Sequence, residues 1–267
     1  MSTTIHDAEA DNAPVPAVRG SFPLLEFALT TVLLFAVVTL VRWLMAPSSP
    51  FAIADTHLAL AVVGVVVGAV LLGLIRSPWG RQSGAHLNPA VSVALWLMGA
   101  FPGCWVLPYA VAQLAGSLAG AGLAGLVWGK AATAAPVRYA AVQPAPDWNS
   151  LQVVLAEAGC LVAVTLLIGF FLAYPTRARW LPLSLAAATA LIVGVLGPRS
   201  GGATNPARQF GPALLSGNHD DLTVYLIAPV LGAVLGAGIH QLLQRYGAAR
   251  RVPTYRLCPT TAEPDPS

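Results

Sequence analysis

Long apolar segments separated by short polar stretches make up most of this 267-residue chain. Six of these segments are of the length, about 20 residues, that an α-helix needs to cross the hydrocarbon core of a membrane. Several apolar runs of this length in one chain indicate a helical membrane protein that crosses the membrane repeatedly. The pattern predicts transmembrane helices at about residues 23–44, 58–75, 105–127, 151–173, 181–196 and 222–243.

Two further apolar runs are too short to cross, and each follows a copy of the same motif. Residues 83–90 read SGAHLNPA and residues 200–207 read SGGATNPA, so five of eight positions agree. The first run ends near Met98, and its eleven residues from Asn88 would span about 16 Å, roughly half of a hydrocarbon core. The second run covers residues 210–215. Both are therefore predicted to enter the membrane as re-entrant half-helices.

The order of these elements indicates an inverted repeat. Each half, at about 22–128 and 151–246, holds three spans with a half-helix between its second and third span. Because three is odd, the halves must have opposite orientations, and interrupted segments at matching positions mark the functional site. We predict an all-α membrane protein of six transmembrane helices and two half-helices over residues 22–246. Residues 1–21 are expected to be a disordered tail and residues 247–267 a flexible one.

Charge is scarce and unevenly placed. Only 9% of residues are charged, against about 25% in soluble domains, and 56% are hydrophobic. Nine Lys or Arg residues fall on the side of the two termini and four on the other. By the positive-inside rule both termini are predicted to be cytoplasmic, in a multi-pass protein of the cell membrane.

The repeated Asn-Pro-Ala sequences have a definite local chemistry. Asn is a strong N-cap and Pro is favoured at the first helical position, so Asn88-Pro89-Ala90 and Asn205-Pro206-Ala207 should each begin a half-helix. The side-chain oxygen caps the helix, which leaves the NH₂ group to donate outward. Two such caps meeting near the midplane, with the positive ends of two helices, would favour water or an alcohol and disfavour a cation or a proton wire.

Other polar residues in the spans are predicted to support or line this site. Glu26, Glu157 and Gln113 are interpreted as holding the irregular loops from behind; the alternative for each, a satisfied packing residue, is largely compatible with this role because support is itself structural. His86 is interpreted as a loop-orienting side chain rather than a metal ligand, because no second ligand lies near it in sequence. Arg208, next to the second motif, is interpreted as a pore residue that donates to solutes and repels cations, with snorkelling to the surface as the alternative.

These residues resemble the aquaporin and glycerol-facilitator family, the major intrinsic proteins. The resemblance is carried by SGAHLNPAV at 83–91, SGGATNPARQFGP at 200–212, YAVAQLAGSLAG at 109–120, and the two glutamates, and it covers about residues 22–246. It implies a homotetramer with one pore in each subunit. It also implies an outer constriction of four residues, which, counted without insertions, are Gly68, Val193, Gly202 and Arg208.

This constriction departs from the usual members of the family. Strict water channels place Phe and His at the two helical positions, and glycerol channels place aromatic residues there, whereas this chain has Gly68 and Val193. With Gly202 as well, the opening is expected to be wide, similar to the plant silicon-type subgroup. Gln209 stands where glycerol facilitators have Asp and water channels a small residue, so that position does not decide between them.

The sequence therefore predicts a passive channel for water and small uncharged solutes that excludes ions and protons. Glycerol, urea and metalloid hydroxides such as arsenous or silicic acid are the expected solutes. A water-selective aquaporin and, from another class, an ion-coupled secondary transporter are the alternatives, as is a non-conducting membrane protein. No nucleophile–base pair or metal cluster indicates an enzyme, a metal site or a cofactor. The expected partners are water, neutral solutes, membrane lipid and copies of this chain, and no nucleic acid.

Overall fold

A computed structural model describes residues 21–253, and over these residues the protein is a bundle of helices without strands. Most of both predicted tails, residues 1–20 and 254–267, lies outside the described residues. The described part beyond residue 246 forms no helix. The disorder predicted for the tails therefore stays a prediction.

Six long helices follow the predicted spans to within about two residues. Five of them are long and apolar enough to cross a membrane. The other, with 16 residues, has a length of about 24 Å and is the shortest. Their bounds are Phe22–Met45 (α1), Thr56–Arg76 (α2), Val106–Trp128 (α5), Ser150–Leu172 (α7), Leu181–Leu196 (α9) and Leu222–Arg245 (α11).

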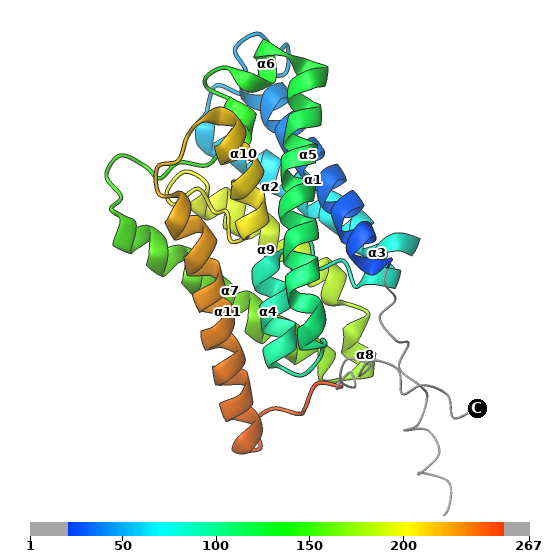
Figure 1. Ribbon diagram of the computed structural model, residues 1–267. Helices are drawn as coiled ribbons and strands as arrows, with labels where there is room; N and C mark the ends of the chain where they lie inside the picture. Colours follow the sequence, from blue (N-terminus) through cyan, green and yellow to red (C-terminus); the bar gives the residue numbers. More distant parts are fainter. Residues whose placement is uncertain (1–20, 254–267) are drawn as a thin grey trace, which may run out of the picture.

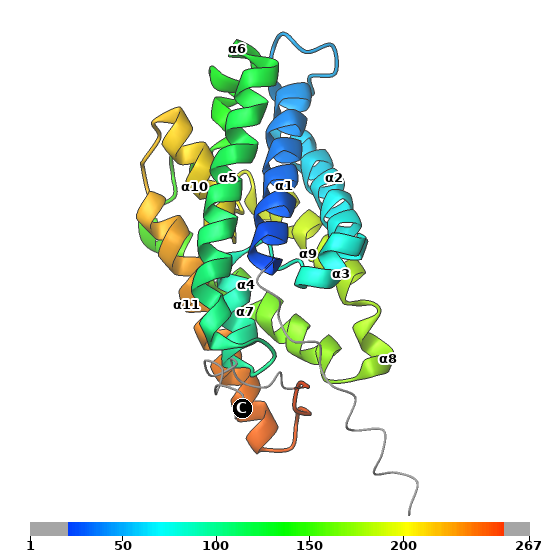
Figure 2. The same cartoon turned by 45° about the vertical axis from the view of Figure 1, so that its right-hand side comes forward.

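Two short helices lie among the long ones and match the predicted half-helices. Pro89–Leu97 (α4) and Pro206–Ser216 (α10) each begin directly after a motif asparagine. The second starts earlier than the apolar pattern alone indicates, because Arg208 and Gln209 belong to its first turn and are polar. Figures 1 and 2 show α4 and α10 at different heights of the bundle, flanked by long helices on several sides.

The remaining connections contain only short helices. They are Pro78–Ser83 (α3), Lys130–Thr133 (α6) and Pro175–Ala178 (α8), with 3-10 turns at Gly103–Trp105 and Arg138–Ala140. Figure 1 places α6 at one end of the bundle and α8 at the other, so the two ends are called here the α6 end and the α8 end.

Packing of the long helices repeats between the two halves. Helix α1 packs on α5, α7 packs on α11, and α2 with α9 joins the halves. Glycines make the first two contacts close: a Cβ on Gly116 would lie 2.5 Å from the carbonyl oxygen of Phe27 in α1, and one on Gly232 would lie 2.1 Å from that of Ala158 in α7. Small residues permit such approach of membrane helices. The inverted repeat predicted from the spans is therefore present in the packing.

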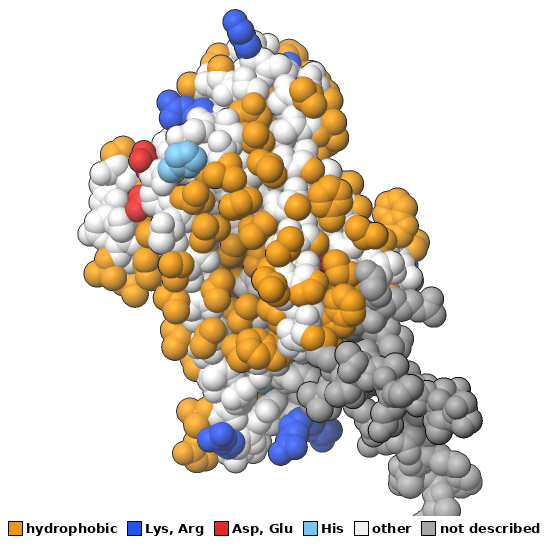
Figure 3. Space-filling view, in the orientation of Figure 1, with side chains coloured by type: hydrophobic (Ala, Val, Ile, Leu, Met, Phe, Trp, Pro, Cys, Tyr) orange, Lys and Arg blue, Asp and Glu red, His pale blue; other side chains and the backbone are white. Residues whose placement is uncertain are grey.

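The surface fits a lipid environment. Figure 3 shows hydrophobic side chains over the middle of the molecule, with Lys and Arg gathered toward its two ends. Large apolar residues are strongly exposed along the helices, for example Leu126 at 85% and Leu107 at 71%. Exposure on this scale is unfavourable in water but is required where hydrocarbon is the solvent.

Candidate pore and constriction

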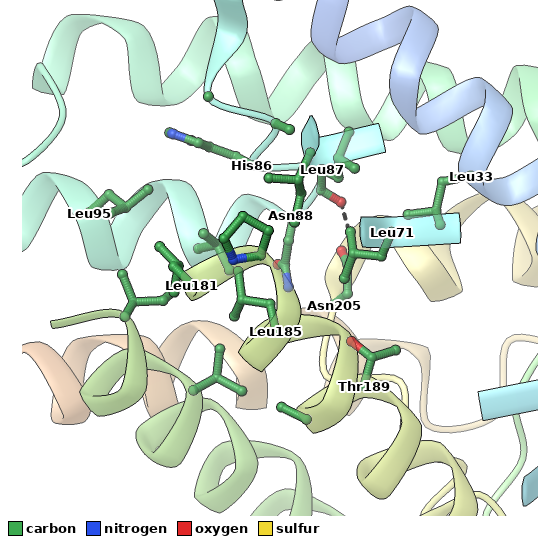
Figure 4. A pocket seen from close by; sticks show the side chains of 18 of the residues that line it. Leu33, Leu71, His86, Leu87, Asn88, Leu95, Leu181, Leu185, Thr189 and Asn205 are labelled. Atoms are coloured by element: carbon green, nitrogen blue, oxygen red, sulfur yellow. Dashed lines mark hydrogen bonds between the residues drawn. The ribbon is translucent and has the colours of Figure 1, made fainter. Parts of the chain in front are cut away.

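The two motif asparagines cap their helices and hold the two loops together. Oδ1 of Asn88 accepts from the N–H of Ala90 at 2.9 Å, and Oδ1 of Asn205 accepts from that of Ala207 at 2.9 Å. The Nδ2 group of Asn88 donates to the carbonyl of Thr204 at 3.0 Å, in the opposite loop. The Nδ2 group of Asn205 donates to the carbonyl of Leu87 at 2.8 Å, the contact drawn as a dashed line in Figure 4.

These cross-loop bonds refine what the sequence predicts for the asparagines. The prediction leaves the whole NH₂ group of each side chain free to donate outward. An amide NH₂ carries two donors, and one of them on each asparagine joins the two halves instead. The second N–H of each amide takes no part in these contacts between the loops, so it is the donor that can face a solute in the pore.

The loops before the asparagines share an unusual backbone conformation. Gly84 and Gly201, 117 positions apart, both have φ of 90°. Leu87 and Thr204, also 117 apart, have φ of 52° and 46°. A non-glycine residue in this region costs about 1–3 kcal/mol and persists only where its surroundings hold it. Both loops therefore depend on anchors.

Glu26 is the anchor of the first loop. It is fully buried in α1, and Oε1 accepts from Ser83 Oγ at 2.7 Å and from the N–H of His86 at 3.1 Å. Its Oε2 accepts from the N–H of Leu87 at 2.8 Å and from Gln113 Nε2 at 2.8 Å. A carboxylate with four donors satisfies backbone groups that the loop itself leaves unpaired.

Glu157 occupies the corresponding place in the second half. It is fully buried in α7, and its Oε1 accepts from Ser200 Oγ at 2.8 Å and from the N–H of Ala203 at 3.1 Å. Its Oε2 accepts from the N–H of Thr204. The structure thus places both predicted support glutamates behind the loops, in contact with them.

His86 and Gln113 lie together beside the first loop. The Nδ1 atom of His86 is 3.0 Å from Ser92 Oγ, and Gln113 Nε2 is 3.3 Å from the same hydroxyl. The His86 ring also packs edge-on against Phe101, with ring centroids 4.6 Å apart. These contacts connect the loop to α4 and α5. No group of three His, Cys, Asp or Glu residues that could hold a metal ion occurs in residues 21–253.

A large cavity reaches from the α8 end to the asparagines. Its volume is about 790 Å³, and its wall is formed by the two loops on one side and by apolar side chains on the other. Figure 4 shows Leu181, Leu185 and Thr189 of α9, spaced one turn apart, on the wall that faces Asn88 and Asn205. A smaller cavity of about 150 Å³ opens toward the α6 end.

The two cavities meet at a ring of shared lining residues. They are Val37, Val67, Val193, Gly202 and Arg208. Three of the four residues predicted for the outer constriction are therefore brought together here. The guanidinium of Arg208 is fixed at this point, because its Nη1 donates to the carbonyl of Ala140 at 2.8 Å. Arg208 therefore does not snorkel to the surface.

The fourth predicted residue, Gly68, is not part of the ring, and this prediction is wrong. A Cβ on Gly68 would lie 2.5 Å from the carbonyl oxygen of Ala186, so this face of α2 packs on the backbone of α9. Val67 lines both cavities instead. Counting back from Asn88 without insertions fails by one residue, and the intervening chain contains the short helix α3.

Comparison with known proteins agrees with this geometry. Residues 22–240 match the family model of the major intrinsic proteins. The chain belongs to the major intrinsic protein family. The propanediol uptake facilitator PduF of Citrobacter freundii is 35% identical over 197 residues, 60% of this chain and 71% of that protein. The probable aquaporin AqpM of Archaeoglobus fulgidus is 34% identical over 189 residues, 68% of this chain and 76% of that protein.

A solved structure shows the same fold. The X-ray structure of the aquaglyceroporin from Plasmodium falciparum matches with a TM-score of 0.66 and 22% identity, covering 85% of this chain and 97% of that one. Members of this family are passive channels and not enzymes. The protein is accordingly a multi-pass membrane channel for water or small solutes, as the sequence predicts at this level.

Several residues of this major intrinsic protein's site were not singled out from the sequence. Ser83 and Ser200 donate to the two glutamates, and Tyr109 and Tyr225 donate to the carbonyls of these serines at 2.8 and 2.5 Å. The serines are 117 positions apart and the tyrosines 116. The serines lie inside the repeated motif, whereas the tyrosines match between the halves only if the spacing changes by one residue.

Proposed function

We propose that this channel passes water together with small uncharged polyhydroxylated solutes, such as glycerol and 1,2-propanediol, and also urea and metalloid hydroxides. The single observation that supports this is the composition of the ring. Around Arg208 stand Val37, Val67, Val193 and Gly202, which include no aromatic ring and no histidine. The ring therefore lacks both the bulk and the second donor of a filter for water alone.

Because Val67 rather than Gly68 lines the ring, the expected opening is smaller, but its lining is still apolar apart from Arg208. Val67 adds volume that a glycine would not, so the opening is narrower than the sequence alone suggests. The ring now combines an aliphatic lining with one strong donor group. A polyol has the complementary pattern, because its carbon chain contacts apolar side chains while its hydroxyls accept from a guanidinium. The name of the propanediol facilitator among the relatives supports this solute class.

Exclusion of ions and protons is part of the proposal. Asn88 and Asn205 stand at the N-termini of α4 and α10, whose positive ends converge on the middle of the pore. A cation would meet this field and the charge of Arg208 without a compensating carboxylate in the lumen, since Glu26 and Glu157 are fully buried behind the loops. The same burial argues against an ion-coupled transporter, which needs titratable groups on its path.

The assembly and orientation also belong to the proposal. We expect a homotetramer in the cell membrane with a pore in each subunit, with the α8 end and both termini in the cytoplasm. Residues 22–246 would be the channel domain, and the asparagine motifs and the ring its working parts. The orientation rests on the excess of Lys and Arg at the α8 end.

The decisive experiment compares two phenylalanine substitutions in α2. Purified protein in vesicles is tested by stopped-flow light scattering with water, glycerol, 1,2-propanediol, urea and arsenite. The unaltered channel should pass all of them. Val67→Phe should lower glycerol flux at least about tenfold, because a barrier of about 1.4 kcal/mol is sufficient, and should lower water flux less.

Val65→Phe is the matched control, since Val65 lies in the same helix but is 62% exposed on its outer face. It should leave all permeabilities unchanged. Water flux without any solute flux in the unaltered protein would instead identify a water-selective channel. Flux that requires a proton or sodium gradient would identify a coupled transporter.

A further inference from the structure

Gln209 is a buried amide whose two polar atoms are both used. It follows Arg208 in the first turn of α10 and is fully buried. Its Oε1 accepts from the N–H of Val142 at 2.9 Å, and its Nε2 donates to the carbonyl of Val142 at 3.0 Å. This two-bond pairing requires one donor and one acceptor on a planar group, which is the pattern of an amide and not of an ionised carboxylate.

The segment that Gln209 holds has a strained backbone. Arg138, Tyr139 and Ala140 have φ of 42°, 56° and 58°, three consecutive non-glycine residues in the left-handed region. Each costs about 1–3 kcal/mol and needs external anchoring. Val142 also sits closely on the second loop, because a Cβ on Gly201 would lie 2.7 Å from the Cβ of Val142. Gln209 thus secures the segment two residues beyond the strained run.

The strained segment in turn contacts the guanidinium of the ring. The carbonyl of Ala140, at the end of the strained run, accepts from Arg208 Nη1. Both Ala140 and Val142 are buried, with 4% and 8% exposure. The chain of contacts therefore runs from Gln209 through Val142 and Ala140 back to Arg208. Residues adjacent in sequence are coupled through a segment nearly 70 positions away.

We propose that Gln209 is a specificity-determining positioning residue. By pairing with Val142 it fixes the segment from Arg138 to Val142, and this segment sets the direction of the Arg208 guanidinium in the ring. The inference rests on the proposed function and deepens it. An aspartate at this position would be shorter and would offer only acceptors, so it could not make the same pairing.

The test measures the ratio of glycerol to water permeability in the same vesicles. This ratio is independent of how many channels are folded, so a merely structural role would leave it unchanged. Gln209→Leu removes both bonds at similar volume, and Gln209→Glu places an acceptor against the carbonyl of Val142. Both should change the ratio at least about threefold, which corresponds to about 0.65 kcal/mol. Both substitutions leave Arg208 itself in place.

Gln241→Leu is the control. Gln241 also donates from its amide to a backbone carbonyl, that of Leu97 at 2.6 Å, but on exposed α11 surface away from the ring. It should leave the ratio unchanged. Val142→Pro serves if the Gln209 variants do not fold, since it removes the N–H that Gln209 accepts from and leaves α10 intact. It should also change the ratio at least about threefold.

The outcomes separate this inference from the proposed function. Folded Gln209 variants with an unchanged ratio, or with both permeabilities lowered in equal proportion, would overturn the positioning role while leaving the solute range of the unaltered channel as measured. If the unaltered channel passes no glycerol, the proposed function fails by itself. The positioning role is then read from per-channel water flux, normalised to reconstituted protein, which should change in the Gln209 variants and not in Gln241→Leu.

Discussion

The two loops that meet at the centre of the channel have the same backbone but different support. Glu26 accepts from four donors, one of which is Gln113 in α5. Glu157 accepts from three, and the position that matches Gln113, 116 residues later, is Pro229. The glutamate of the first loop is therefore also held by a side chain of a neighbouring helix, whereas the glutamate of the second loop has no such partner at the matching position.

The positions after each asparagine show a further difference between the halves. Val91 and Ser92 in the first half correspond to Arg208 and Gln209 in the second, 117 residues later. Ser92 faces His86 and Gln113 inside the bundle, while Gln209 reaches the segment at Val142. The repeated residues build the scaffold, and the residues that differ between the copies build the constriction. Three predictions test this division.

The largest effect is expected from removing the anchoring carboxylates. Glu26→Leu leaves four donors without their acceptor and Glu157→Leu leaves three, at about 1–3 kcal/mol for each buried group. Such a sum approaches the whole stability of a typical protein. Neither variant should be recovered as a monodisperse species by size-exclusion chromatography in detergent, and Glu26→Leu should be the more affected.

Thr31→Val is a suitable control for the first helix, because the Thr31 hydroxyl donates within α1 itself, to the Phe27 carbonyl at 2.8 Å, rather than to a loop. Its recovery should equal that of the unaltered protein. Well-folded, fully conducting glutamate variants would show that the loops do not need these anchors.

An intermediate effect, on the exclusion of cations, is expected when Arg208 is replaced by the residue that the first half has at the matching position. Arg208→Val gives the second half the residue that the first has at Val91. A unit charge about 4 Å from a passing cation raises its energy by about 4 kcal/mol at an effective dielectric constant of 20, so proton or sodium leak through the vesicles should rise at least about tenfold. Val91→Leu should show no such leak when proton and sodium entry into the vesicles are followed with ion-sensitive fluorescent dyes for both variants. An equal leak in both variants would mean that the asymmetry of the ring is unimportant.

The smallest effect is expected from the tyrosines, where the halves agree. Tyr109→Phe and Tyr225→Phe each remove one hydrogen bond to a loop serine, worth about 1 kcal/mol. Each should lower the midpoint of thermal unfolding by about 2–4 °C, and the two shifts should be similar. A difference of more than a few degrees between them would show that the scaffold itself is asymmetric.

Most of the scaffold could be predicted from the sequence because its causes are local or periodic. Apolar length predicts the spans, Asn followed by Pro predicts the start of each half-helix, and the duplication predicts the opposite orientation of the halves. The glutamates were recognised as supports because a carboxylate at membrane depth needs partners. The two serines stand inside the repeated motif without any local sign of their partners, and the two tyrosines match only after a one-residue change in the spacing of the repeat.

The ring was less predictable, and Gly68 shows the reason. Which side of a helix faces a pore depends on its rotation, and a shift of one residue turns a side chain by about 100°. Gly64 and Gly68 lie on one face of α2, and the close contact they allow with α9 fixes that rotation. Counting positions from a motif cannot detect this, because a single added residue in the connection changes the register.

The sequence by itself determined the class of the protein, its inverted repeat and the two capped half-helices at its centre, since each follows from apolar length, capping chemistry and duplication. Only the tertiary structure decided that Val67 rather than Gly68 joins the ring, that the asparagines bind each other's loops, and that Gln209 pairs with Val142. These contacts join residues far apart in the chain. Their geometry depends on how whole helices pack and rotate against one another, which no local pattern specifies.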